Sequence, residues 1–187
     1  EENYSVSKYK IWNKIKINLQ RNLQSNNKPL IIDCGSNIGC SSEYFRRVFE
    51  GSHIVQIESN TKSIEFSKKN IFDQNVDYIN KAISSDNKSY YIDDSSVDNR
   101  SSKISEEGDY KVESITVDQI LKKYDKKTYP FIIKIDIEGF EANLFEKNYD
   151  WVNKFDIIII ELHDWMLPGK ANSYNFINSI SENMKNK

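Results

Sequence analysis

The stretch Ile31-Ile32-Asp33-Cys34-Gly35-Ser36-Asn37-Ile38-Gly39 (IIDCGSNIG, residues 31–39) decides the fold of this 187-residue chain. An apolar run ends in an acid, and two glycines with three residues between them lead into a segment with helical spacing. This order is typical of a buried strand that turns directly into a helix. Gly35 can adopt a positive φ, and Gly39 lets the following helix approach its neighbours closely. The stretch therefore predicts a ligand-binding turn at the end of a strand in a parallel sheet.

Apolar runs alternate with amphipathic segments on both sides of this turn. The sequence predicts strands at 30–33, 53–58, 76–79, 131–136 and 156–161, and helices at about 7–26, 41–50, 62–72, 117–124, 140–147 and 172–184. Strands separated by helices imply βαβ units. The runs at 131–135 and 157–160 are apolar on both sides, as in strands covered on both faces. We predict an α/β fold with a doubly wound, mostly parallel sheet: an N-terminal helix within 1–28 and a single domain over 29–187.

Composition narrows the class of protein. The chain has 26 Lys and Arg against 28 Asp and Glu, a formal charge of −2, and so lacks the basic footprint of a nucleic-acid binder. It has no apolar run near the roughly 20 residues that span a bilayer, and no signal-peptide pattern. Its two cysteines, Cys34 and Cys40, read as free thiols. We expect a cytoplasmic protein that neither spans a membrane nor binds nucleic acid, and the oligomeric state stays open.

The acid beside the glycine turn indicates which ligand it binds. The dinucleotide fingerprint GxGxxG seats a pyrophosphate on a helix N-terminus, whereas this turn reads GxxxG after Asp33. A carboxylate there repels a pyrophosphate and suits a cationic ligand that carries an amino acid, such as S-adenosylmethionine. Glu58 ends the next predicted strand 25 residues later, where an acid can bind both ribose hydroxyls. A nicotinamide-dependent oxidoreductase shares this sheet but needs the other glycine spacing.

Motifs along most of the chain resemble those of one family. They are IIDCGSNIG, IVQIESN, NKAIS, ESITVDQIL, IIKIDIEGFE and IIIIELH, within residues 30–164. Together they resemble the successive motifs of FkbM-type methyltransferases, and the most specific is KIDIEGFE at 134–141. The resemblance implies a Rossmann-like class I methyltransferase fold, S-adenosylmethionine as the methyl donor, and an oxygen acceptor on a sugar or another small hydroxylated metabolite. The alternative is a methyltransferase-like cofactor-binding module without turnover, acting in a larger protein or assembly.

The resemblance also implies a cofactor site. The residues carried over to it are Asp33, Gly35, Ser36, Asn37, Gly39, Glu58, Ser59, Asn60, Asn80, Ala82 and Asp136. Glu58 would hold the ribose, and Asn80 and Ala82 would close over the adenine. The polar segment 84–109 reads as an irregular excursion, and its residues Asn99, Ser101 and Ser102 would face the acceptor. The class I fold normally ends in an antiparallel strand pair, which we expect to be missing from this sequence.

Four candidates for catalysis follow the fourth and fifth predicted strands. They are Asp136, Glu138, Glu161 and His163. A hydroxyl acceptor must lose a proton, and the ordinary pKa of histidine, near 6.5, suits His163 as the general base. A structural role for His163 is equally open. The four could instead bind a divalent ion, but their spacing is no recognised metal pattern, so we predict no metal. Trp165, in the loop after His163, is a candidate acceptor wall.

Overall fold

The computed structural model describes residues 11–93, 103–105, 107–108, 110–165 and 169–185. Its main sheet has five parallel strands in the order β3-β2-β1-β8-β9. These are β1 (Lys28–Cys34), β2 (His53–Ile57), β3 (Val76–Ile79), β8 (Thr128–Ile135) and β9 (Ile157–Ile160). The doubly wound parallel sheet is thereby confirmed. The strand order reverses between β1 and β8, which is where such sheets bind ligands.

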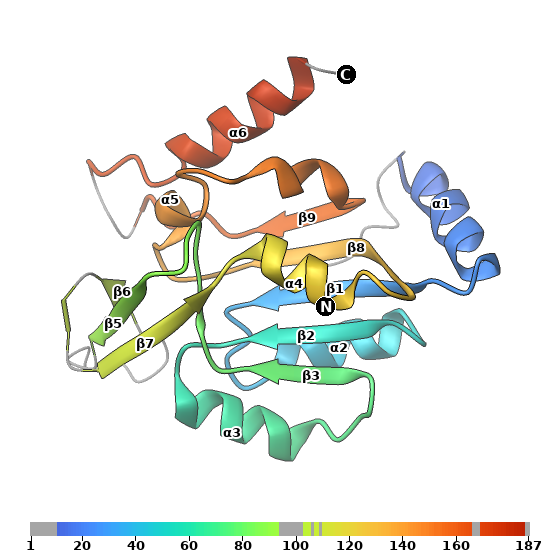
Figure 1. Ribbon diagram of the computed structural model, residues 1–187, viewed down its shortest axis with the longest axis horizontal. Coiled ribbons are helices and arrows are strands. Elements are labelled where there is room, and N and C mark those ends of the chain that lie inside the picture. The colour runs from blue at the N-terminus through green and yellow to red at the C-terminus, as the bar shows by residue number, and fades with distance from the viewer. Residues whose placement is uncertain (1–10, 94–102, 106, 109, 166–168, 186–187) are drawn as a thin grey trace.

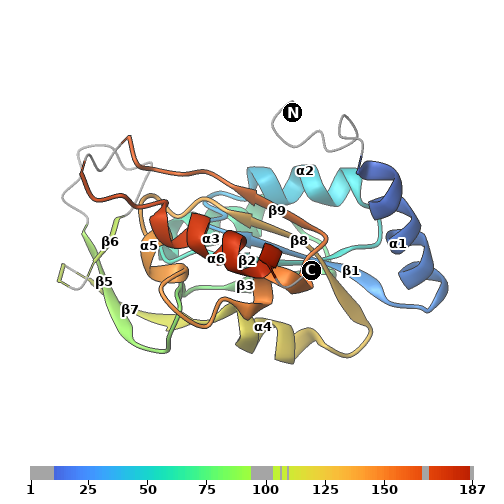
Figure 2. The ribbon, with the colours of Figure 1, turned by 90° about the horizontal axis from the view of Figure 1, so that it is seen from above.

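Helices cover both faces of this sheet. They are α1 (Trp12–Gln24), α2 (Cys40–Val48), α3 (Thr61–Asn70), α4 (Val117–Tyr124), α5 (Glu141–Leu144) and α6 (Tyr174–Lys185), with a 3₁₀ helix, η3, at Asp150–Lys154. Figure 2 shows α2 and α4 on opposite faces. Local signals fix where helices begin: the Asn60 side chain caps α3, and Thr116 and Gln119 form a capping box on α4.

The prediction of a helix over 140–147 is wrong in extent, because α5 has a single turn. Glu138 and Gly139 precede it in the left-handed region, with φ of 53° and 95°. Asn148 follows at φ 56° and donates from its side-chain amide to the Ser85 carbonyl. Left-handed residues on both sides cannot continue a right-handed helix. The chain instead forms η3, which brings Trp151 into the core.

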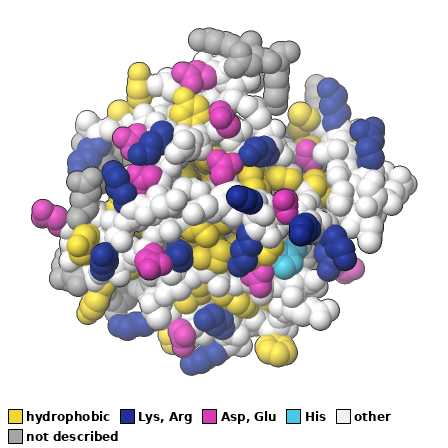
Figure 3. Space-filling view, in the orientation of Figure 1, with side chains coloured by type: hydrophobic (Ala, Val, Ile, Leu, Met, Phe, Trp, Pro, Cys, Tyr) yellow, Lys and Arg dark blue, Asp and Glu magenta, His cyan; other side chains and the backbone are white. Residues whose placement is uncertain are grey.

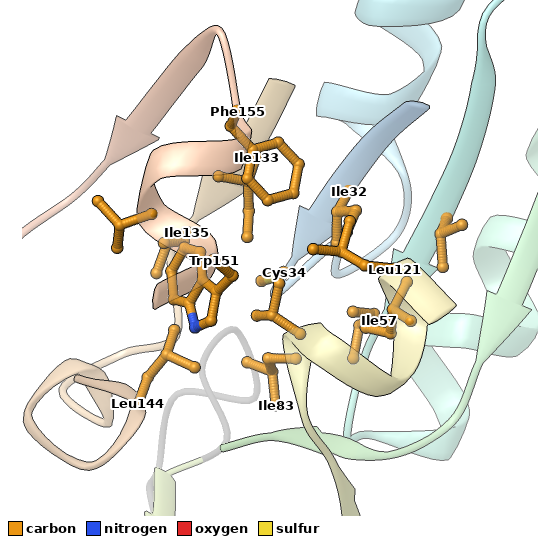
Figure 4. Packing of buried hydrophobic residues seen from close by; sticks show 14 of the residues in the cluster. Ile32, Cys34, Ile57, Ile83, Leu121, Ile133, Ile135, Leu144, Trp151 and Phe155 are labelled. Atoms are coloured by element: carbon orange, nitrogen blue, oxygen red, sulfur yellow. The ribbon is translucent and has the colours of Figure 1, made fainter. Parts of the chain in front are cut away.

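The core has two halves, one on each face of the main sheet. Figure 4 shows the half in which Ile32, Cys34 and Ile133 from the strands meet Trp151 and Leu121. The other half is centred on Phe45, Phe49 and Phe131 and receives α1 through Trp12, Ile15 and Leu19. The alternation of β1 between these halves explains why its residues from Pro29 to Cys34 are all buried.

Two short segments of the predicted excursion over 84–109 belong to a second sheet. It consists of β4 (Ala82–Ile83), β5 (Ser89–Asp93), β6 (Lys103–Ser105) and β7 (Tyr110–Ile115), in the order β4-β7-β5-β6. β5 pairs antiparallel with both β6 and β7. Figure 1 shows this sheet on the side toward which the main strands point, so it stands over their carboxyl ends. The segment 84–109 is rich in Ser and Asp and its strands are short, so the sequence shows little alternation of apolar and polar residues there.

The surface and the cysteines add two facts. On the face seen in Figure 3, acidic and basic side chains are interspersed around apolar patches. Cys34 is buried, Cys40 is exposed, and both are free. In the described ranges, no helix combines the length and the hydropathy needed to cross a membrane.

Candidate active site

The glycine turn is clamped between β2 and β8. The Gly35 and Ser36 amides donate to the Ile57 carbonyl at 2.9 and 3.1 Å. Gly35 has φ +73°, and a Cβ there would lie 1.8 Å from the Asp136 carbonyl oxygen. Gly39, at φ +90°, leaves no room for a Cβ against Ser67 of α3. Both glycines are therefore required by space as well as by backbone conformation.

A cavity of about 600 Å³, counted with its mouth, opens beside this turn at the carboxyl ends of the main strands. The lining comes from the glycine turn, the end of β2, the start of the second sheet and the end of β8. Eight predicted site residues line it: Gly35, Asn37, Glu58, Ser59, Asn60, Ala82, Asp136 and Glu138.

Glu58 is held in place by two backbone amides. Asn60 N–H donates to its Oε1 at 2.8 Å, and Asn37 N–H donates to its Oε2 at 2.9 Å. Burial raises the pKa of Glu58, and these two hydrogen bonds oppose that rise. Each carboxylate oxygen keeps a second lone pair, so the pair can still accept hydrogen bonds from a diol.

The predicted cofactor residue Asp33 does not line the cavity, which corrects the expectation that its carboxylate faces the ligand. Its side chain is fully buried, accepts a hydrogen bond from Ser42 Oγ at 2.6 Å and lies 3.4 Å from Lys134 Nζ. Lys134 Nζ also donates to the Gly35 carbonyl at 2.9 Å and pairs with Asp136 Oδ2 at 3.2 Å. A buried lysine attracts the nearest buried carboxylate, so Asp33 turns toward Lys134 beneath the turn.

Three other predicted cofactor residues also lie outside the cavity lining. Ser36 is 3% exposed, and its hydroxyl lies beneath the turn. Gly39 caps α2 at its N-terminus. Asn80 donates from its side-chain amide to the carbonyls of Glu58 and Ser59. These residues shape the loops that carry Glu58 and Asn37, because each bonds or packs against the backbone of those loops.

His163 lies at the centre of a carboxylate cluster. Its ring is 2% exposed, and Nδ1 is 2.7 Å from Oε1 of Glu141, which is itself fully buried. Asn172 donates to the other Glu141 oxygen. A carboxylate on Nδ1 fixes that nitrogen as the N–H and leaves Nε2 as the acceptor. The sequence placed Glu141 in the KIDIEGFE motif without assigning it a role.

Nε2 of His163 faces the other three candidates. It lies 3.7 Å from Asp136 Oδ1, 3.7 Å from Glu138 Oε2 and 3.8 Å from Glu161 Oε1. All four predicted catalytic residues are thus brought together. Burial raises the pKa of Glu138; His163 opposes the rise, and the neighbouring acids Asp136 and Glu161 add to it. Only Asp136 and Glu138 of the four also line the cavity.

Six residues of the cavity lining have no role predicted from the sequence: Ile57, Ser63, Lys81, Ile83, Ile104 and Ile137. Trp165 is 73% exposed and packs on no core cluster. The predicted acceptor residues Asn99, Ser101 and Ser102 lie outside the described residues.

A ligand cavity at the switch point of a doubly wound sheet, with an acid directly after β2 and carboxylates after β8, defines a class I methyltransferase domain. The family model described as "Methyltransferase FkbM domain" matches residues 33–187. The chain belongs to this family, whose methyl donor is S-adenosylmethionine. No curated protein matches the sequence.

Solved structures of low similarity also match. A putative S-adenosylmethionine-dependent methyltransferase from Listeria monocytogenes is 13% identical over 72% of this chain and 47% of its own, with a TM-score of 0.33. The plantazolicin methyltransferase BpumL with SAH is 12% identical over 94% of this chain and 63% of its own, with a TM-score of 0.40. The chain thus spans about half to two thirds of the length of these proteins.

Proposed function

We propose that this chain transfers a methyl group from S-adenosylmethionine to a hydroxyl group of a small uncharged molecule, such as a sugar. One observation carries the proposal: a single cavity is bounded by Glu58 at one end and by Asp136 and Glu138 at the other. The first end suits a ribose, and the second suits a hydroxyl that must lose its proton.

The residues of the first end fit the cofactor. Glu58 offers carboxylate oxygens to the two ribose hydroxyls, and Asn37 and Gly35 bring the backbone of the turn beside it. Ala82, Ile83 and Ile104 offer apolar surface for the adenine ring. The carboxylates of Glu58 and Asp136 complement a cationic ligand. When bound, the cofactor supplies a methyl group already activated on a sulfonium.

At the other end of the cavity, carboxylates can accept a hydrogen bond from the hydroxyl group of the methyl acceptor. Glu138 lines the cavity, so it is placed to accept a hydrogen bond from that hydroxyl and to take its proton. His163 is buried behind Asp136 and Glu138, and we assign it the task of fixing their positions. In the absence of a bound ion, these three clustered carboxylates repel phosphorylated or carboxylated acceptors, which favours neutral ones.

The test is formation of S-adenosylhomocysteine from S-adenosylmethionine with a panel of acceptors. The panel contains neutral glycosides, sugar phosphates and primary amines. Turnover with neutral glycosides, lost in Glu138→Gln while the cofactor still binds, is the expected result. Turnover confined to amines or to phosphorylated sugars contradicts the proposed acceptor class.

A further inference from the structure

We propose that Asp136, Glu161 and His163 form a binding site for a divalent cation at the acceptor end of the cavity. The binding itself is independent of the proposed function; its use in placing an acceptor hydroxyl rests on that function. Two observations carry the inference: the mutual geometry of the three side chains, and the orientation of the buried His163 ring.

The three side chains come together because of the sheet. Asp136 follows β8 and Glu161 follows β9, which are parallel neighbours. The Glu161 amide donates to the Ile135 carbonyl at 2.9 Å, so the two strand ends stay in register. One ligand atom from each residue lies within 4.8 Å of the other two. Ligands about 2.0–2.2 Å from one ion are at most about 4.4 Å apart, so a small rotation of the exposed Glu161 side chain is enough for one ion to contact all three.

His163 gives an observation independent of the acids. The His163 ring is 2% exposed, and its Nδ1 forms a hydrogen bond of 2.7 Å with Glu141 Oε1. Nε2 therefore points at the carboxylates, yet no atom in the described part of the chain makes a hydrogen bond to it. Its nearest acidic oxygens, at 3.7–3.8 Å, are beyond hydrogen-bonding distance but at the spacing of ligands that share an ion. A carboxylate behind a ligating histidine is the usual outer-shell arrangement at metal sites.

The charge of the cluster also favours a cation. Asp136, Glu138 and Glu161 surround Nε2, while Lys134 lies on the other oxygen of Asp136. One imidazole with two carboxylates is a mixed nitrogen and oxygen set, which suits Mn²⁺, Fe²⁺ or Zn²⁺ better than Ca²⁺. Three protein ligands leave coordination positions open; the Glu161 side chain is 62% exposed, and Asp136 lines the cavity.

In the experiment, the chain is first treated with a chelator and then titrated with one ion at a time. Binding of Mn²⁺ is measured by the electron paramagnetic resonance signal of the free ion, and binding of Zn²⁺ by calorimetry. Wild type should bind one equivalent of at least one ion. Glu161→Gln, at a 62% exposed side chain that the fold tolerates, should weaken binding by at least about tenfold. Glu50→Gln, an exposed carboxylate at the opposite end of the sheet, should leave it unchanged.

Absence of stoichiometric binding of both ions to wild type overturns the inference, as does equal affinity in Glu161→Gln. In either case the cluster serves only to hold the His163 ring among the carboxylates. Cofactor affinity is measured separately on the metal-free protein, so failure of the metal site leaves the proposed methyl transfer standing. Failure of cofactor binding likewise leaves the metal titration interpretable.

Discussion

Glu141 and His163 form a buried pair across the end of the main sheet, with Oε1 and Nδ1 2.7 Å apart and exposures of 0% and 2%. The pair joins α5 to the segment after β9. It sets the direction of Nε2, and with it the arrangement of the carboxylates at the cavity.

Replacing Glu141 with Gln removes the charge while keeping the shape. The buried imidazole and the Asn172 amide lose a carboxylate acceptor, so the free energy of unfolding should fall by about 1–3 kcal/mol. Urea denaturation measures this. Glu146→Gln, at an exposed site nearby, is the control and should change little. Equal stability of both variants would show that the pair contributes nothing.

Gly35→Ala should damage both the fold and the cofactor site. The added Cβ would overlap the Asp136 carbonyl, so we expect a loss of more than about 3 kcal/mol in stability. Gly51→Ala is a matched control, because Gly51 has a similar φ of +78° with nothing within 4 Å. Its cost is confined to the backbone conformation, about 1 kcal/mol. Similar losses in the two variants would contradict the close contact between the turn and β8.

Lys134→Met should leave the buried carboxylate of Asp33 without its ion-pair partner. Asp33 would keep its hydrogen bond from Ser42 but lose its ion pair with Lys134, at a cost of about 3 kcal/mol in unfolding free energy. Adding Asp33→Asn removes the stranded charge, so the double variant should recover part of this loss. Chemical denaturation of the three variants gives the comparison. A double variant less stable than Lys134→Met would mean that the two residues act independently.

Stability should depend on pH through Asp86, which ties the second sheet to residue 147. Burial opposes ionisation, but hydrogen bonds from Lys147 and Tyr90 outweigh it and lower the pKa of Asp86 to about 2. Because the folded pKa is below the unfolded value near 3.8, the contribution is present above about pH 4 and is lost toward pH 2. The stability gap between wild type and Asp86→Asn should therefore close below pH 4 in thermal unfolding. A stability gap that widens on acidification would mean that folding raises the pKa of Asp86, which contradicts this prediction.

The sequence predicted the main sheet because its strands carry long apolar runs, and it predicted Glu58, Asn37 and Gly35 because parallel strands end at one edge. It did not predict the direction of Asp33, which depends on Lys134, 101 positions later in the chain. Within 84–109 it indicated one small strand near the Tyr90–Ile92 patch, but not the pairing of four short strands into a second sheet. It also missed the role of Glu141, which depends on α5 meeting the segment after β9. Pairings between distant segments leave no local pattern.

The central claim is that S-adenosylmethionine binds in the cavity with its ribose on Glu58. Isothermal titration of the folded chain with S-adenosylmethionine tests it most directly, with Glu58→Gln and the exposed Glu65→Gln compared under the same conditions. We predict 1:1 binding to wild type and to Glu65→Gln, and affinity at least about tenfold lower in Glu58→Gln. No binding to the folded wild type, or unchanged affinity in Glu58→Gln, would contradict the claim.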